Sequence, residues 1–236
     1  MTKCIVRDCV NNGNVSSKKN CAGGIAGLAE LGMVKNCEGY GSISAGGSYA
    51  GGVLGYSYTA IRSCWSVCRV EAAEYAGGIS GYATKLTECM DMSNIDPSIP
   101  CSGAIAGYMD LKDPDVEIQD NIFVSGSIGA IDGISYSGKA VPVSYEELLE
   151  KGTEEAPLPE QFTDLKLTFV ADGKTVRTVS FSYGESIPSS RIPPVPAKEG
   201  YIGSWPEYDY SAVYFSDTIE AEYVTKHSTL ASDEKR

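Results

Sequence analysis

A two-part pattern occurs four times in the first half of the chain, and this repetition constrains the fold more than any other feature. In the first part of each copy, a cysteine is followed six residues later by valine or isoleucine. The cysteines are Cys9, Cys37, Cys64 and Cys89, and they lie 28, 27 and 25 residues apart. In the second part, a glycine-rich stretch ends in Gly27, Gly55, Gly81 or Gly107, with steps of 28, 26 and 26 residues. A fixed period of this size predicts a solenoid, in which each unit buries its apolar side against the units before and after it.

Each copy contains three short apolar segments that are typical of β-strands. The first covers residues 10–15, 38–43, 65–70 and 90–95 in the successive copies. The second places Ile25, Val53, Ile79 and Ile105 at one inward position, and the third contributes Val34, Ile61 and Leu86. Turn-forming polar residues and glycines separate the segments. We therefore expect a mainly β chain that begins with a parallel β-solenoid, or β-helix, of about four to five coils.

The repeated cysteines are expected to stack as a column of buried thiols. Residues at one repeat position lie about 4.8 Å apart in a parallel solenoid, and cysteine behaves as a small hydrophobic residue that suits a narrow interior. This spacing also permits disulfides, although parallel side chains are poorly aimed for them. A zinc site is less favoured, because the chain has no Cys-x-x-Cys pair and a single histidine. Cys21 and Cys101 occupy the repeat position of Tyr49 and Tyr75, so we expect them to fill space there.

Residues 4–140 resemble an array of GLUG-motif repeats through the recurring cysteine pattern and the Gly-Gly-x-x-Gly pattern. Such repeats occur in large secreted or cell-surface bacterial proteins. Some of these are adhesins, and others are immunoglobulin A metallopeptidases in which the repeats precede the catalytic region. The resemblance implies a secreted, surface-attached protein. Departures from the pattern at Cys68, Ser93 and Ala104 imply local irregularity within the same fold.

The repeats are followed by segments of different character. The stretch up to residue 143 is expected to form a degenerate last coil, so that the solenoid covers residues 1–143. Residues 144–162 are expected to form a short capping helix, with Ser144 as its N-cap and Glu147 three residues later, and then an acidic linker. Residues 226–236 are polar, and we expect them to be disordered.

From Thr163 onward, apolar and polar residues alternate on both sides of an Asp-Gly turn at residues 172–173, which predicts a β-hairpin. A Tyr-Gly-Glu sequence, a proline-rich crossover, a Gly-Tyr-x-x-x-Trp sequence and a closing strand over residues 219–224 follow. This order resembles the Listeria-Bacteroides repeat, the β-grasp-like B-repeat of internalin-type surface proteins. The resemblance covers residues 163–225 and implies a small β-grasp-like spacer or partner-binding module, with Trp205 in its core.

The composition and the motifs exclude several classes of function. The formal net charge is -12 and the basic residues are scattered, so we expect no nucleic-acid partner. We expect no membrane span, because no apolar run approaches the about 20 residues that cross a bilayer. The start of the chain has no signal-peptide pattern, so an export signal and an anchor are expected outside it.

The repeated glycine pattern lacks a βαβ context, so no cofactor is expected. The only histidine, His227, lies in the polar tail, which argues against a His-dependent catalytic triad.

The densest acidic cluster consists of Asp110, Asp113, Asp115, Glu117 and Asp120. We expect a solvated loop at this position. A weak calcium site made of oxygen ligands is the second interpretation, and carboxylate catalysis is the third. No metal-binding or catalytic residue is therefore assigned.

Three tyrosines are the candidate ligand-contact residues. Tyr56, Tyr82 and Tyr108 each follow the closing glycine of a copy, at steps of 26 and 26 residues. If they face outward, they form an aromatic ladder on which sugar rings or a partner chain could lie. Mutual stacking that only supports the solenoid is the favoured interpretation.

Together these features predict a non-enzymatic, monomeric part of an extracellular bacterial protein that is attached to the cell surface. It would act as an adhesin-like stalk with a module that contacts a host protein or a polysaccharide. The first alternative is an accessory, non-catalytic region of a larger secreted hydrolase or metallopeptidase. The second alternative is a β-helix enzyme that acts on polysaccharides.

Overall fold

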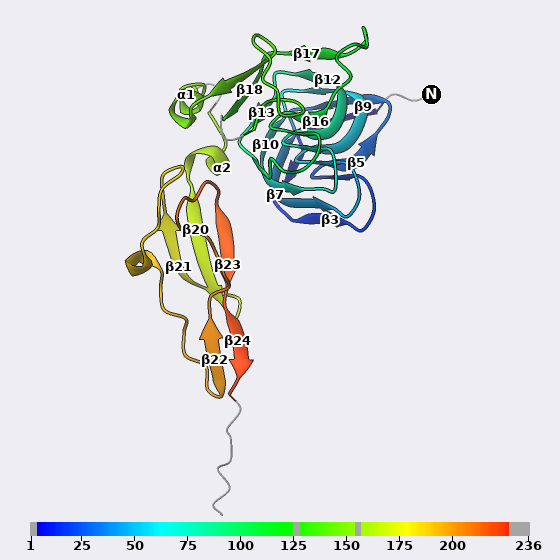
Figure 1. Ribbon diagram of the computed structural model, residues 1–236. Helices are drawn as coiled ribbons and strands as arrows, with labels where there is room; N and C mark the ends of the chain where they lie inside the picture. Colours follow the sequence, from blue (N-terminus) through cyan, green and yellow to red (C-terminus); the bar gives the residue numbers. More distant parts are fainter. Residues whose placement is uncertain (1–3, 125–127, 154–156, 227–236) are drawn as a thin grey trace, which may run out of the picture. The chain divides into compact units, whose positions relative to one another are not determined.

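The computed structural model describes residues 4–124, 128–153 and 157–226 (Figure 1). The chain divides into two compact units, unit 1 from Met1 to Thr163 and unit 2 from Asp164 to Arg236. Unit 1 is a parallel β-solenoid of about four turns. The prediction of a mainly β chain that begins with a parallel solenoid is therefore confirmed.

Three parallel sheets form the solenoid. The first contains β1 (Cys4–Arg7), β6 (Gly32–Lys35), β9 (Leu54–Arg62), β12 (Ser80–Thr87) and β16 (Ala106–Tyr108), with β5 (Ala26–Ala29) paired to β9 and β17 (Glu117–Gln119) paired to β12. The second contains β2 (Val10–Asn11), β7 (Glu38–Ala45), β10 (Trp65–Glu71), β13 (Met90–Asp91), β18 (Asn121–Val124) and β19 (Ala140–Val143), with β3 (Val15–Ser17) paired to β7 and β14 (Asn94–Ile95) paired to β10. The third contains β4 (Ala22–Gly23), β8 (Ala50–Gly51), β11 (Ala76–Gly77) and β15 (Ser102–Gly103).

Apolar residues one repeat apart lie one above another inside the solenoid. Ile61 pairs with Val34 in the coil before it and with Leu86 in the coil after it. All three side chains are buried, and they belong to one hydrophobic cluster that extends through the coils. This register confirms that the sequence period is the period of the coil.

The cysteine column is confirmed in the interior coils. Cys37, Cys64 and Cys89 are buried, whereas Cys9 in the first coil is exposed. Their backbones form one repeated hydrogen bond: the N–H of the residue that follows each cysteine donates to the carbonyl of the cysteine one coil earlier, for example Trp65 to Cys37 at 3.0 Å. The eight cysteines are free thiols, and this includes the three buried members of the column.

The repeated glycines are needed because the backbones of adjacent coils approach closely. A Cβ atom at Gly77 would lie 1.9 Å from the carbonyl oxygen of Ser80 and 2.6 Å from the backbone nitrogen of Gly107. Both contacts are far shorter than any real Cβ contact and involve backbone atoms. Gly77 does not adopt a positive φ, so the close approach of the backbones is the reason for glycine at this position.

The fourth coil is followed by an irregular coil and a short helix. β17 and β18 extend the first and second sheets, and β19 adds a further parallel strand to β18. The next residues form α1 (Tyr145–Leu149), in which the Ser144 side chain accepts a hydrogen bond from the Glu147 N–H and the Glu147 side chain accepts one from the Ser144 N–H. This arrangement confirms the predicted capping box.

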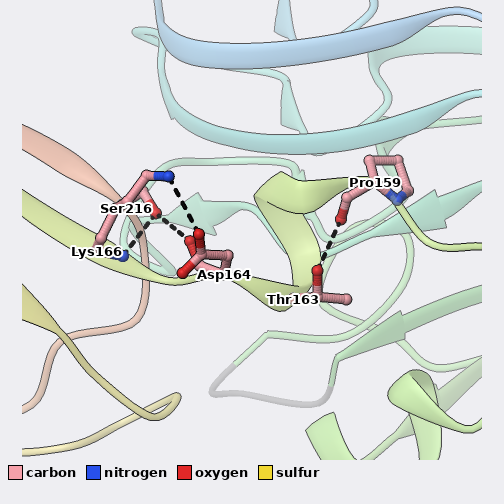
Figure 2. A network of polar contacts seen from close by, with 5 residues as sticks. All are labelled: Pro159, Thr163, Asp164, Lys166 and Ser216. Carbon is pink, nitrogen blue, oxygen red and sulfur yellow. Dashed lines mark hydrogen bonds and ion pairs between the residues drawn. The ribbon is translucent and has the colours of Figure 1, made fainter.

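The segment that was expected to be a linker ends in a second helix, α2 (Glu160–Thr163). Its Phe162 is fully buried, and the ring lies edge-on to Trp65 with centroids 6.2 Å apart. The hydroxyl of Thr163 donates to the carbonyl of Pro159 at 3.4 Å (Figure 2). Residues 160–163 are therefore a packed part of unit 1.

Unit 2 is a small β structure with two sheets. The hairpin of β20 (Lys166–Ala171) and β21 (Lys174–Ser180) has the predicted two-residue turn, and β23 (Asp217–Glu220) pairs in parallel with β20. β22 (Tyr201–Ser204) pairs with β24 (Glu222–Thr225) in antiparallel orientation. A short 3-10 helix, η1 (Ser189–Arg191), lies in the proline-rich crossover.

The single closing strand predicted over residues 219–224 is wrong. The chain forms two strands there, and each belongs to a different sheet. Ala221 lies between them, and its N–H donates to Val170 of β20 at 2.8 Å before the chain moves to the second sheet. Alternation of apolar and polar residues continues through Ala221, so the sequence pattern does not mark this break.

The core of unit 2 forms beneath the hairpin. Leu167, Phe169 and Ile219 are buried. The ring of Trp205 lies 5.1 Å from that of Phe169 and its Nε1 donates to the Pro193 carbonyl at 2.7 Å, which confirms that Trp205 packs in this core.

The start of β20 is joined to residues far along the chain. The Lys166 N–H donates to the Ser216 hydroxyl at 3.0 Å, and the Lys166 ammonium contacts the Asp164 carboxylate at 3.2 Å (Figure 2).

The C-terminal tail was expected to be disordered. Its residues from 227 onward, including His227, lie outside the described residues.

Candidate functional site

The three candidate tyrosines form a stacked ladder on the first sheet. Tyr82 of β12 pairs in register with Tyr56 of β9 and with Tyr108 of β16. The rings of Tyr56 and Tyr82 are 4.5 Å apart and inclined by 12°, and those of Tyr82 and Tyr108 are 6.2 Å apart and inclined by 28°. The structure therefore brings together all three residues that the sequence selected.

A second tyrosine column runs beside this ladder. Tyr49 and Tyr75 precede β8 and β11, and their rings stack 4.8 Å apart at 17°. The ring of Tyr49 meets that of Tyr56 edge-on, with centroids 4.7 Å apart. Cys21 and Cys101 hold the corresponding positions in the first and fourth coils, since the strands that follow them pair in register. The predicted equivalence of these cysteines and tyrosines is confirmed.

Tyr58 completes the group. Its side chain is 53% exposed, and the hydroxyls of Tyr56 and Tyr58 lie 2.8 Å apart in a hydrogen bond. The following residues are called the tyrosine surface below: Tyr49, Tyr56, Tyr58, Tyr75, Tyr82 and Tyr108. Tyr49 and Tyr75 had a periodic signal in the sequence, whereas Tyr58 occurs in one coil only and had none.

The rings of the tyrosine surface pack mainly on one another. Apart from Tyr58, its members are half-buried. Both faces of Tyr82 are covered, one by Tyr56 and the other by Tyr108. Burial raises the pKa of Tyr56 and of Tyr82, so both hydroxyls stay neutral and can donate or accept hydrogen bonds.

Carboxylates flank this surface. Repulsion from Glu74 is the leading cause of the raised pKa of Tyr75. At Tyr82, repulsion from Asp110 and Asp113 adds to the larger effect of burial. These carboxylates therefore disfavour the ionised form of Tyr75 and of Tyr82.

The acidic loop between residues 110 and 120 is built from local turns. Asp110 accepts the N–H of Lys112, and Asp113 accepts the N–H of Asp115 at 2.9 Å. Among the described residues, no group of three or more His, Cys, Asp or Glu side chains is placed to hold a metal ion. The loop conformation gives the calcium interpretation no support.

One carboxyl group inside the solenoid was missed by the sequence analysis. Asp91 of β13 is 1% exposed, and its Oδ2 accepts the N–H of Ser93 at 3.0 Å. Its Oδ1 is buried without a hydrogen-bond partner among the described residues. Desolvation raises the pKa of Asp91 to about 7. No motif marks this position, because an aspartate in a short polar strand segment is usually exposed.

A cavity of about 360 Å³ lies on the second sheet, beside β10 and β14. Arg69, Glu71, Asn94 and Asp96 line it together with apolar neighbours. These side chains belong to a different sheet from the tyrosine ladder, so the cavity is a separate feature.

The fold of unit 1 defines it as a parallel β-solenoid. Within the described part of the chain, no helix combines the length and the apolarity needed to span a membrane. Comparison with protein-family models, with curated proteins and with solved structures found no match.

Proposed function

We propose that the chain is a non-enzymatic, extracellular part of a bacterial surface protein, in which the solenoid serves as a stalk and the tyrosine surface contacts a ligand. The observation that carries this proposal is the tyrosine surface itself. Six tyrosines gather on one side of a repeating scaffold and remain partly exposed. Tyrosine is enriched at binding surfaces because its ring buries area while its hydroxyl bonds to a partner.

The resemblance of the coils to GLUG-motif repeats supports a secreted location. Unit 2 resembles a β-grasp-like B-repeat module in its hairpin, crossover and Trp205, and this resemblance also supports a secreted location. In this proposal unit 2 is a spacer or a second contact module, and the chain acts as a monomer. The ligand is a host protein or a polysaccharide.

The burial of Asp91 removes this residue from the candidates for catalysis. A carboxyl group with a pKa near 7 is suited to general acid or base chemistry. Asp91 is enclosed by the solenoid, so its carboxyl group cannot reach a substrate in this conformation.

Binding of the full chain to arrayed glycans and to immobilised matrix proteins tests the proposal. We expect the Tyr56→Ser/Tyr82→Ser/Tyr108→Ser variant to lose at least tenfold in affinity for any ligand that the wild type binds. Tyr214→Ser is the matched control, since Tyr214 is 41% exposed and belongs to unit 2. A melting curve checks that each variant is folded. Unchanged binding by the folded triple variant would show that the ladder only supports the solenoid.

A further inference from the structure

We propose that the partner of the tyrosine surface is a basic peptide segment, rich in lysine or arginine, of another protein. This inference rests on the proposed function and narrows it, because it selects a cationic protein ligand over a neutral glycan. Charge, ring geometry and the chemistry of long basic side chains each support it.

Exposed carboxylates are close in sequence to the tyrosine surface: Glu74 directly precedes Tyr75, and Asp110 and Asp113 follow Tyr108, with Lys112 between them. Glu74, Asp110 and Asp113 are exposed and act electrostatically on its rings. Among the residues that the structure describes, none of the three carboxylates forms an ion pair. The chain as a whole carries a formal net charge of -12. A cationic segment would be attracted over a distance of about 8–10 Å at physiological salt and would neutralise these carboxylates on binding.

The stacking of the rings disfavours a sugar ligand. Sugars lie flat on exposed aromatic faces, but both faces of Tyr82 are covered by its neighbours in the ladder. The faces of Tyr56 meet Tyr82 on one side and are approached edge-on by Tyr49 and Tyr58. These contacts occupy the faces of Tyr56 and Tyr82 on which a sugar ring would have to lie.

The tyrosine surface suits lysine and arginine side chains. Their aliphatic stems pack along apolar ring edges while the charged head remains at the polar rim. The head can donate hydrogen bonds to tyrosine hydroxyls, which burial keeps neutral, and can pair with Glu74, Asp110 or Asp113. The ladder covers two coil steps, about 10 Å, which matches a short extended segment.

Fluorescence anisotropy with a labelled ten-residue peptide of alternating lysine and serine tests the inference on the full chain. We expect binding that weakens at least tenfold between 50 and 300 mM salt. The Glu74→Gln/Asp110→Asn/Asp113→Asn variant should lose at least tenfold in affinity. The matched control is Glu199→Gln/Glu207→Gln/Glu220→Gln, which removes the same charge from exposed positions of unit 2 and should bind like the wild type.

Two further outcomes separate this inference from the proposed function. If a neutral glycan binds in a ladder-dependent manner and the basic peptide does not, the inference is overturned and the proposed function stands. If the full chain binds neither the basic peptide nor any arrayed glycan or immobilised matrix protein, both are overturned. Equal loss of peptide binding in the two charge-neutralised variants would show that net charge alone attracts the peptide, and would also overturn the inference.

Discussion

At the scale of single residues, the solenoid interior tolerates few side chains, because each coil is covered directly by the next. The interior accepts small and apolar side chains, such as Cys64 and Ile61, that repeat in register. Asp91 is the exception, since it places a carboxyl group with an unpartnered oxygen in this environment. An unpaired buried carboxylate costs several kcal/mol, so such a group is favoured in its neutral form.

Asp91 should make the stability of unit 1 depend on pH. Its pKa in the folded protein is about 7, above the about 3.9 of an unfolded chain. The contribution of Asp91 to stability is therefore greatest below about pH 4 and is lost as the pH rises through 7, by at most roughly 4 kcal/mol. Asp91→Asn removes this charge, so its stability relative to the wild type should increase from pH 4 to pH 8 in urea titrations.

The control for this prediction is Asp96→Asn. Asp96 lies in the turn after β14, and the Ser98 N–H lowers the pKa of its carboxyl group, so its replacement should show no gain as the pH rises. A stability difference between Asp91→Asn and the wild type that is the same at every pH would contradict the assignment of Asp91 as a buried neutral acid.

The glycine positions predict a large difference between two substitutions of the same type. Gly77→Ala forces a methyl group against the backbone of the same coil and of the next one, and overpacking of this kind costs about 1–3 kcal/mol or more. Gly13→Ala meets only the Asn11 side chain at 3.6 Å and should change the free energy of unfolding by less than about 1 kcal/mol. Chemical denaturation measures both. Equal losses would show that close approach is not the reason for the repeated glycine.

At the scale of elements, the sequence predicted what repeats and missed what occurs once. The strands of the inner coils, such as β7 and β10, lie where the cysteine pattern placed them. In the first and fourth coils the corresponding stretch divides into two short strands, β2 and β3 or β13 and β14. At these breaks a side-chain oxygen, of Asn14 or of Ser93, accepts the N–H of Ser42 or of Cys68 in the neighbouring coil. Side-chain competition for backbone groups is invisible in a hydrophobic pattern.

The helix α2 and the residue Tyr58 were not predicted, because each occurs once and is not part of the repeat. α2 has four residues within a stretch rich in proline and glutamate, a composition typical of linkers. Its role depends on the position of Phe162 against Trp65, which is a contact between residues far apart in the sequence. Periodicity carries no information on such contacts.

Phe162→Ala tests whether α2 belongs to the solenoid. Removing a fully buried phenylalanine should destabilise unit 1 by about 3–5 kcal/mol. Leu149→Ala on α1, where the side chain is 38% exposed, should cost clearly less. Denaturation followed by Trp65 fluorescence reports the change, because the Trp65 ring lies against Phe162; Trp205→Phe is used as the background to remove the second tryptophan signal. A loss below 1 kcal/mol would mean that residues 160–163 behave as the linker first expected.

At the scale of the whole molecule, one repeat produces both the stability and the proposed surface. The register that buries Cys37 and Cys64 inside the solenoid also stacks Tyr56 and Tyr82 outside it. A solenoid thereby converts a period in the sequence into a linear array in space. The ladder and the interior columns are therefore two consequences of the same pairing.

The measurement that tests this pairing most directly is the set of backbone NOEs of Trp65 in an isotope-labelled sample. The account predicts contacts from the Trp65 strand to Glu38 on one side and to Met90 on the other, with the pattern of parallel strands. Contacts from the Trp65 strand to a neighbouring segment in antiparallel order, without Glu38 or Met90, would contradict it.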